Sequence, residues 1–155
     1  MMKKTKTILS FLLLLAIVAI FASCGKDPEI YGKWKVVGLT VTDGENSQSF
    51  DLSQIVTEEI TMEFKKDGQY IIAMDDEEAP GEYTLHGNDI VFKDAYTEQI
   101  YDSEQGLVVN HYDIAGVINS LTKTDLCIEL YPPEQVLASL EIEQEIYVIL
   151  DFERL

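Results

Sequence analysis

The sequence predicts an all-β domain, a small antiparallel up-and-down barrel of about eight strands that occupies residues 30–155. Three observations support this fold class. Apolar and polar residues alternate with a period of two in several short runs, as they do in half-buried strands. Turn-forming residues, such as Lys66-Asp67-Gly68, separate these runs closely enough for hairpins. Consecutive antiparallel strands with one apolar face remove their exposed edges by closing on themselves, so a barrel is expected.

Residues 1–23 have the pattern of a cleaved signal peptide rather than of the folded domain. Three lysines lie near the start, and the apolar run that follows covers about 14 residues, 8–21. A membrane-spanning helix needs roughly 20 apolar residues, so this run is too short to be one. Ala22 and Ser23 are small, as a signal peptidase requires where it approaches the backbone.

The small residues and the cysteine after them resemble the lipobox of bacterial lipoproteins, with Phe21 where that family usually has leucine. The resemblance implies that Cys24 is diacylated on sulfur, becomes the N-terminus after cleavage and is usually acylated again on its amine, with chains such as palmitate. Two or three acyl chains hold a protein on a bilayer, because each buried CH₂ contributes about 0.8 kcal/mol. An ordinary signal peptide that happens to contain a cysteine is the alternative.

Residues 24–29 are expected to form a short lipidated tether. Gly25 stands where an aspartate would retain a lipoprotein in the inner membrane, so the resemblance implies an outer-membrane protein of the cell envelope. Lys26, Asp27 and Glu29 resemble the charged signal of surface-exposed lipoproteins of the Bacteroidetes. A plain solvated linker is the alternative for these residues.

The chain is strongly acidic, with 11 basic and 28 acidic residues and a net charge of −17. Loss of the three signal-peptide lysines would bring the net charge to about −20. This balance argues against nucleic-acid partners, which reward clustered lysine and arginine. With Cys24 lipidated, Cys127 has no disulfide partner, so the domain must be stabilised by its core.

The first predicted strand covers residues 31–42. Trp34 and Val36 share one face, and after Gly38 the apolar positions change parity to Leu39 and Val41, which predicts a bulge or bend at the glycine. A loop is expected over residues 43–49. Residues 50–59 are compatible with a short helical turn capped by Ser49 or Asp51.

The middle of the chain reads as hairpins. Residues 60–65 alternate with Ile60, Met62 and Phe64 inward, and residues 69–74 return after the Asp-Gly turn. An acidic loop is expected over residues 75–80. The next predicted strands are listed here by residue number: 82–85, 90–92, 107–118, 126–131 and 146–152. For residues 133–143 the sequence is compatible either with one or two helical turns or with a hairpin extension.

Gly32-Lys33-Trp34 resembles the G-x-W motif of lipocalins. Arg154, the only arginine, follows the last predicted strand, where lipocalins have a basic residue that packs across that tryptophan. With the lipobox and the hairpin meander, these features resemble lipocalin-like lipoproteins of the Bacteroidetes. The resemblance implies that Gly32, Trp34 and Arg154 close one end of the barrel, with the guanidinium–indole contact worth about 0.5–2 kcal/mol. The alternative is that Trp34 is an ordinary core residue and Arg154 a solvated tail.

No motif in the sequence indicates catalysis, a cofactor or a metal. His86, His111 and Cys127 lack the spacing of a zinc site, and the acidic run at residues 75–78 lacks the alternating ligands of a calcium loop. Six aromatic residues are candidates to line a pocket in the barrel. They are Phe64, Tyr70, Tyr83, Phe92, Tyr112 and Tyr147. A barrel of eight strands can equally be filled by such side chains.

We therefore expect a non-enzymatic outer-membrane lipoprotein, held on the membrane by Cys24, with a lipocalin-like domain that binds a small apolar or amphipathic ligand. The alternative is a protein–protein interaction module with a filled barrel that displays acidic loops at the cell surface. A cavity in the barrel would favour the first hypothesis, and a filled interior would favour the second.

Overall fold

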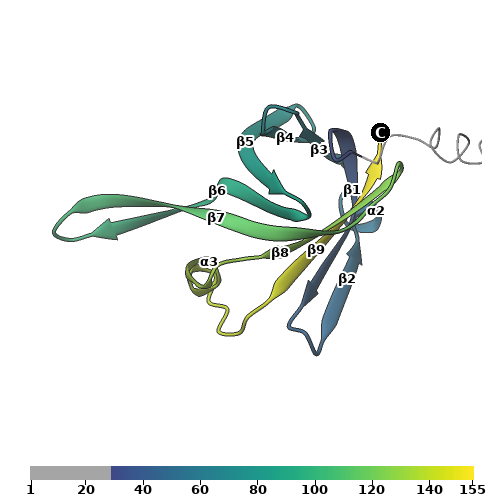
Figure 1. The fold of residues 1–155 in the computed structure, drawn as a ribbon. Coiled ribbons are helices and arrows are strands. Elements are labelled where there is room, and N and C mark those ends of the chain that lie inside the picture. The colour runs from purple at the N-terminus through teal and green to yellow at the C-terminus, as the bar shows by residue number, and fades with distance from the viewer. Residues whose placement is uncertain (1–28) are drawn as a thin grey trace, which may run out of the picture.

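The computed structural model describes residues 29–155, and the predictions made for residues 1–28 lie outside that range. The described chain is an antiparallel sheet of nine strands in nearly sequential order that closes through pairing of β1 with β9 (Figure 1). The elements are β1 (Gly32–Thr42), β2 (Ser47–Asp51), α2 (Leu52–Ile55), β3 (Ile60–Phe64), β4 (Gln69–Met74), β5 (Glu77–His86), β6 (Asp89–Asp102), β7 (Gly106–Leu121), β8 (Asp125–Tyr131), α3 (Glu134–Ser139) and β9 (Tyr147–Arg154).

The barrel has eight positions in its wall, which confirms the predicted fold class. Residues 38–42 of β1 pair with β2, and residues 32–35 pair with β3. These two short strands therefore share one position in the wall, interrupted by α2. The predicted helical turn at residues 50–59 is shorter than expected. Asp51 caps it by accepting a hydrogen bond from the backbone N–H of Ser53 at 3.0 Å.

The change of parity in the first strand is confirmed. The pairing of β1 with β9 shifts register between Val36 and Gly38, so one residue is bulged there. As a result Val36 and Leu39 both face the barrel interior although they are three positions apart. The bulge lies at the glycine that the sequence pattern indicated.

Two predicted loops are shorter in the structure. The first covers only residues 43–46, because residues 47–49 belong to β2. The prediction of an acidic loop over residues 75–80 is wrong except for the first two residues, since β5 begins at Glu77. Residues 77–81 pair with β4 alone, and pairing with β6 starts only at Glu82. Pro80 is tolerated in this strand because a residue at a sheet edge need not donate a ladder hydrogen bond.

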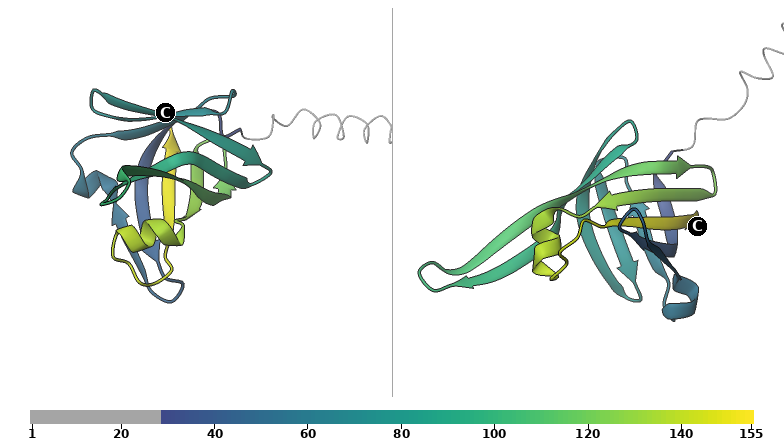
Figure 2. Two further views of the ribbon diagram at one scale, coloured as in Figure 1. Left: turned by 90° about the vertical axis from the view of Figure 1, so that its left-hand side faces the viewer. Right: turned by 90° about the horizontal axis from the view of Figure 1, so that it is seen from below.

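The longest departure from the sequence pattern is the β6–β7 hairpin. The predicted strands at residues 90–92 and 107–118 are parts of strands of 14 and 16 residues. Beyond a register shift between Phe92 and Tyr96, this hairpin leaves the barrel wall and projects from it (Figure 1). We call residues 96–102 and 106–112 the arm. Of the two alternatives for residues 133–143, the structure has the helical one, as α3. Figure 2 shows α3 beside the root of the arm.

The hydrophobic core lies toward the end of the barrel where the turns 65–68, 87–88 and 122–124 and both ends of the described chain meet. We call this the closed end. Two edge-to-face aromatic pairs pack there, Phe64 with Tyr83 at 5.3 Å between centroids and Tyr70 with Phe92 at 5.2 Å. The opposite, open end carries the turns 43–46 and 75–76, α3 and the arm.

Candidate functional site

The closed end is built around Trp34, whose side chain is fully buried. Its Nε1 donates a hydrogen bond to the carbonyl of Ile30 at 2.6 Å. The Arg154 guanidinium lies over the indole, 4.2 Å from the ring centroid, and donates to the carbonyls of Tyr31 at 3.1 Å and Glu29 at 2.6 Å. Arg154 is therefore not a solvated tail, and its contacts connect the last strand to the segment before the first.

Gly32 completes this group. Its φ is +116°, a backbone conformation that residues with a side chain rarely adopt, and a Cβ there would lie 3.2 Å from Nη1 of Arg154. The glycine thus lets the guanidinium pass close to the backbone and reach the indole. The structure brings Gly32, Trp34 and Arg154 together, and their contacts close this end of the barrel.

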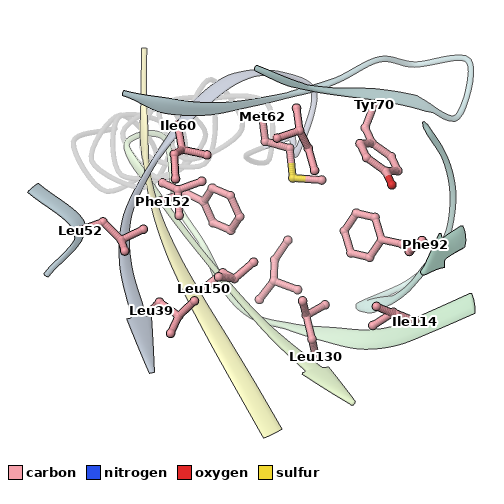
Figure 3. Close-up of a pocket in the computed structure, with 14 residues that line it drawn as sticks. Leu39, Leu52, Ile60, Met62, Tyr70, Phe92, Ile114, Leu130, Leu150 and Phe152 are labelled. Carbon is pink, nitrogen blue, oxygen red and sulfur yellow. The ribbon is translucent and has the colours of Figure 1, made fainter. Parts of the chain in front are cut away.

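Above the core lies a cavity of about 300 Å³ in the barrel interior (Figure 3). Its walls come from seven of the nine strands and from α2. The lining residues are Val36, Leu39, Leu52, Ile60, Met62, Tyr70, Ile72, Phe92, Ala95, Ile114, Ile128, Leu130, Leu150 and Phe152. Among these described residues, only Tyr70 carries a side-chain oxygen. The cavity can therefore hold an apolar group against a lining that is almost entirely apolar.

The predicted pocket residues divide into three groups. Tyr70 and Phe92 line the cavity, side by side on one wall (Figure 3). Phe64 and Tyr83 are buried in the core beneath it, where the hydroxyl of Tyr83 donates to the carbonyl of Lys65 at 2.8 Å. The prediction is corrected for these two residues because they pack against each other instead of bordering empty space.

Tyr112 and Tyr147 are also not lining residues, and the prediction is wrong for both. Tyr112 lies on the arm, and Tyr147 packs against Tyr131 on the outer face of the sheet, 5.4 Å between ring centroids. Aliphatic residues do most of the lining instead. Leu150 and Leu39 could have been found from the inward parity of their strands, a signal that a search for aromatic residues passes over.

The cavity opens to solvent through a gap in the barrel wall. Ile72 is 38 % exposed and Ala95 is exposed, yet both line the cavity. They stand where β6 separates from the first half of β5, next to Gly81. A methyl group at Gly81 would overlap the ring of Tyr70, so the glycine allows that ring to lie across β5.

Comparisons with protein-family models, curated proteins and solved structures give no match to this chain. Within residues 29–155 no group of three or more histidine, cysteine, aspartate or glutamate side chains is placed to hold a metal ion. No helix in the described part of the chain is long and apolar enough to cross a membrane. The cavity is therefore the feature on which a functional proposal can rest.

Cys127 is a half-buried free thiol on β8, and we expect it to be unreactive in the folded protein. Burial, followed by the nearby Asp151 carboxylate, raises its pKa from 9 to about 11. At about pH 8 the reactive thiolate should then be about a hundredfold less populated than in a free cysteine. The rate of iodoacetamide alkylation, followed by mass spectrometry in a Cys24→Ser background, should rise by about that factor when urea unfolds the domain. Equal rates in both states would contradict this assignment.

Proposed function

We propose that this chain is an outer-membrane lipoprotein, anchored through acyl chains on Cys24, whose lipocalin-like barrel binds a small apolar or amphipathic ligand. The observation that carries the proposal is the open apolar cavity in the barrel. Ligand sites are typically concave, mostly apolar and about 300–1,000 Å³ in volume. At about 300 Å³ this cavity suits a small molecule or one chain of a larger amphiphile. Each 100 Å² of apolar ligand surface buried would contribute about 2.5 kcal/mol.

The short stretch of sequence between Cys24 and the closed end would orient the domain on the membrane. Glu29 lies at the closed end, held through its carbonyl by Arg154. Glu29 is five positions after Cys24 in the sequence, so the closed end would lie within about 18 Å of the lipidated residue. A barrel held in this way presents its open end away from the membrane. A ligand could then enter the cavity from the surrounding medium.

Cys24→Ala should abolish acylation and release the domain from the membrane, because no other attachment is proposed. The measurement is incorporation of labelled palmitate in the native host, together with fractionation of membranes and soluble protein. Cys127→Ala is the matched control and should leave both results unchanged. Persistent labelling of the Cys24 variant would contradict the anchor.

Ligand binding can be tested by filling the cavity. Ile114→Trp places an indole among the lining residues and should lower the affinity for decanol, an uncharged apolar probe, at least tenfold. Leu107→Trp is the matched control because Leu107 is 62 % exposed on the arm. Isothermal titration calorimetry gives the affinities, and circular dichroism checks that both variants fold. If the unsubstituted protein does not bind decanol, or the two variants behave alike, the cavity is not the binding site.

The second candidate function is a protein–protein interaction module. Its barrel is not filled, because the interior contains the cavity. The arm exposes apolar side chains near its tip, with Tyr101 81 % and Leu107 62 % exposed on paired positions. Exposed apolar side chains gathered on a projecting hairpin are typical of surfaces that contact another protein. Native mass spectrometry of the protein extracted from its own membranes would separate the candidates, since one predicts a bound small molecule and the other a bound subunit.

A further inference from the structure

The lining of the cavity continues onto one face of the arm. Ile114 of β7 lines the cavity. The register shift beside it is taken up by the additional residues of β6 between Phe92 and Tyr96, while β7 continues as one strand, so Tyr112 and Asn110 lie on the same face of β7 as Ile114. Their partners across the hairpin are Tyr96 and Glu98 of β6. A ligand that leaves the cavity along this face therefore meets two tyrosine rings first and a carboxylate next.

The side chains of Tyr96, Glu98 and Tyr112 are held in place by hydrogen bonds. The hydroxyl of Tyr112 donates to Oε2 of Glu98 at 3.0 Å. The hydroxyl of Tyr96 lies 2.8 Å from Oγ of Ser139 in α3, and that Oγ donates in turn to the carbonyl of Val136 at 2.7 Å. The two rings are 6.3 Å apart between centroids and inclined by 34°. Aromatic rings beside a carboxylate form a surface that attracts an ammonium or guanidinium group.

The charges around the open end favour the same class of ligand. The sequence has no lysine or arginine from residue 94 to residue 122, a stretch that contains the whole arm and five acidic residues. The nearest lysine, Lys93, is paired with Asp113 at 2.7 Å. Asp113 is one position from Ile114 on β7 and therefore lies on the opposite face of the strand. Glu98 is thus free of a competing cation within the described arm, and the surrounding negative potential would repel an anionic head group.

We propose that the ligand is a cationic amphiphile whose apolar part fills the cavity and whose ammonium or guanidinium group binds Glu98 against the rings of Tyr96 and Tyr112. The proposal rests on the function proposed above and specifies its ligand class. Ala95, at the opening, and Glu98 are three residues apart on β6, a separation of about 10 Å along an extended strand. The apolar part of the ligand and its charge should therefore be separated by a comparable length.

Three ten-carbon probes with different head groups test this inference on the full chain: decylammonium, decanoate and decanol. The two ionic probes are used below their micelle concentrations and decanol below its solubility limit. Isothermal titration calorimetry should show decylammonium binding at least tenfold more tightly than decanoate. Glu98→Gln keeps an oxygen that can accept the hydrogen bond of Tyr112 but removes the charge. It should weaken decylammonium binding about five- to tenfold and change decanol binding less than twofold.

Glu104→Gln is the matched control. It makes the same change in net charge at the exposed turn of the arm, and it should alter decylammonium affinity less than twofold. The inference would be overturned if both variants lost decylammonium affinity equally, or if decanoate bound as tightly as decylammonium. In either case, binding of decanol would leave the proposed function standing. Failure of all three probes to bind would overturn both.

Discussion

Trp34→Ala is expected to lower the free energy of unfolding by about 4 kcal/mol. Truncating a large buried aromatic side chain usually costs about 3–5 kcal/mol, because apolar contacts are lost and a cavity remains. Trp34 is fully buried, and its removal also deprives the carbonyl of Ile30 of a donor and the Arg154 guanidinium of the ring beneath it. Urea denaturation followed by circular dichroism measures the change.

Two further variants separate the contributions at this site. Trp34→Phe retains an aromatic ring and should lose clearly less stability than Trp34→Ala. Arg154→Ala removes the guanidinium and its two hydrogen bonds to backbone carbonyls, and it should cost about 1–2 kcal/mol. A loss below about 1 kcal/mol for Trp34→Ala would show that this tryptophan does not close the barrel.

Gly116→Val should be the second most damaging substitution, at about 3 kcal/mol. Gly116 is buried in β7 where that strand pairs with both β6 and β8. A Cβ at this position would lie 2.6 Å from the carbonyl oxygen of Glu129 and 2.9 Å from Cδ2 of Leu130. The first contact is with backbone, so it cannot be relieved by a change of rotamer, and β7 and β8 would have to separate.

Ala115→Val is the matched control for this effect. It introduces the same side chain at the neighbouring position of the same strand, where residue 115 is exposed. It should change the free energy of unfolding by less than about 0.5 kcal/mol. If the two valine variants have the same stability, the close approach of β7 and β8 at Gly116 is not a constraint on the fold.

The elements that the sequence predicted well are those with local signals. The turn at Lys66-Asp67-Gly68 has the expected conformation, with φ of +84° at the glycine and a hydrogen bond between Lys65 and Gln69. The strand that follows it matches residues 69–74 as predicted. In both cases neighbouring residues determine the backbone, so no knowledge of distant contacts is required.

The elements that the sequence did not predict have no such local signals. The first strand of the arm, residues 96–102, and the first half of β5 are exposed strands with charged or mixed faces, so they lack the alternation by which half-buried strands are found. Their pairing depends on a partner strand rather than on burial against the core. Residues 77–80 form a strand because β4 offers them a complete set of backbone partners.

By itself the sequence determined the fold class, the order of the hairpins and the inward side of most strands, because the period of two and the turn residues act over a few positions. Only the tertiary structure decided where the barrel interior is filled and where it is empty. Phe64 and Phe92 have the same apolar character in the sequence, yet one packs against Tyr83 and the other borders the cavity. Unoccupied volume arises from side chains contributed by strands far apart in the chain, so no local pattern records it.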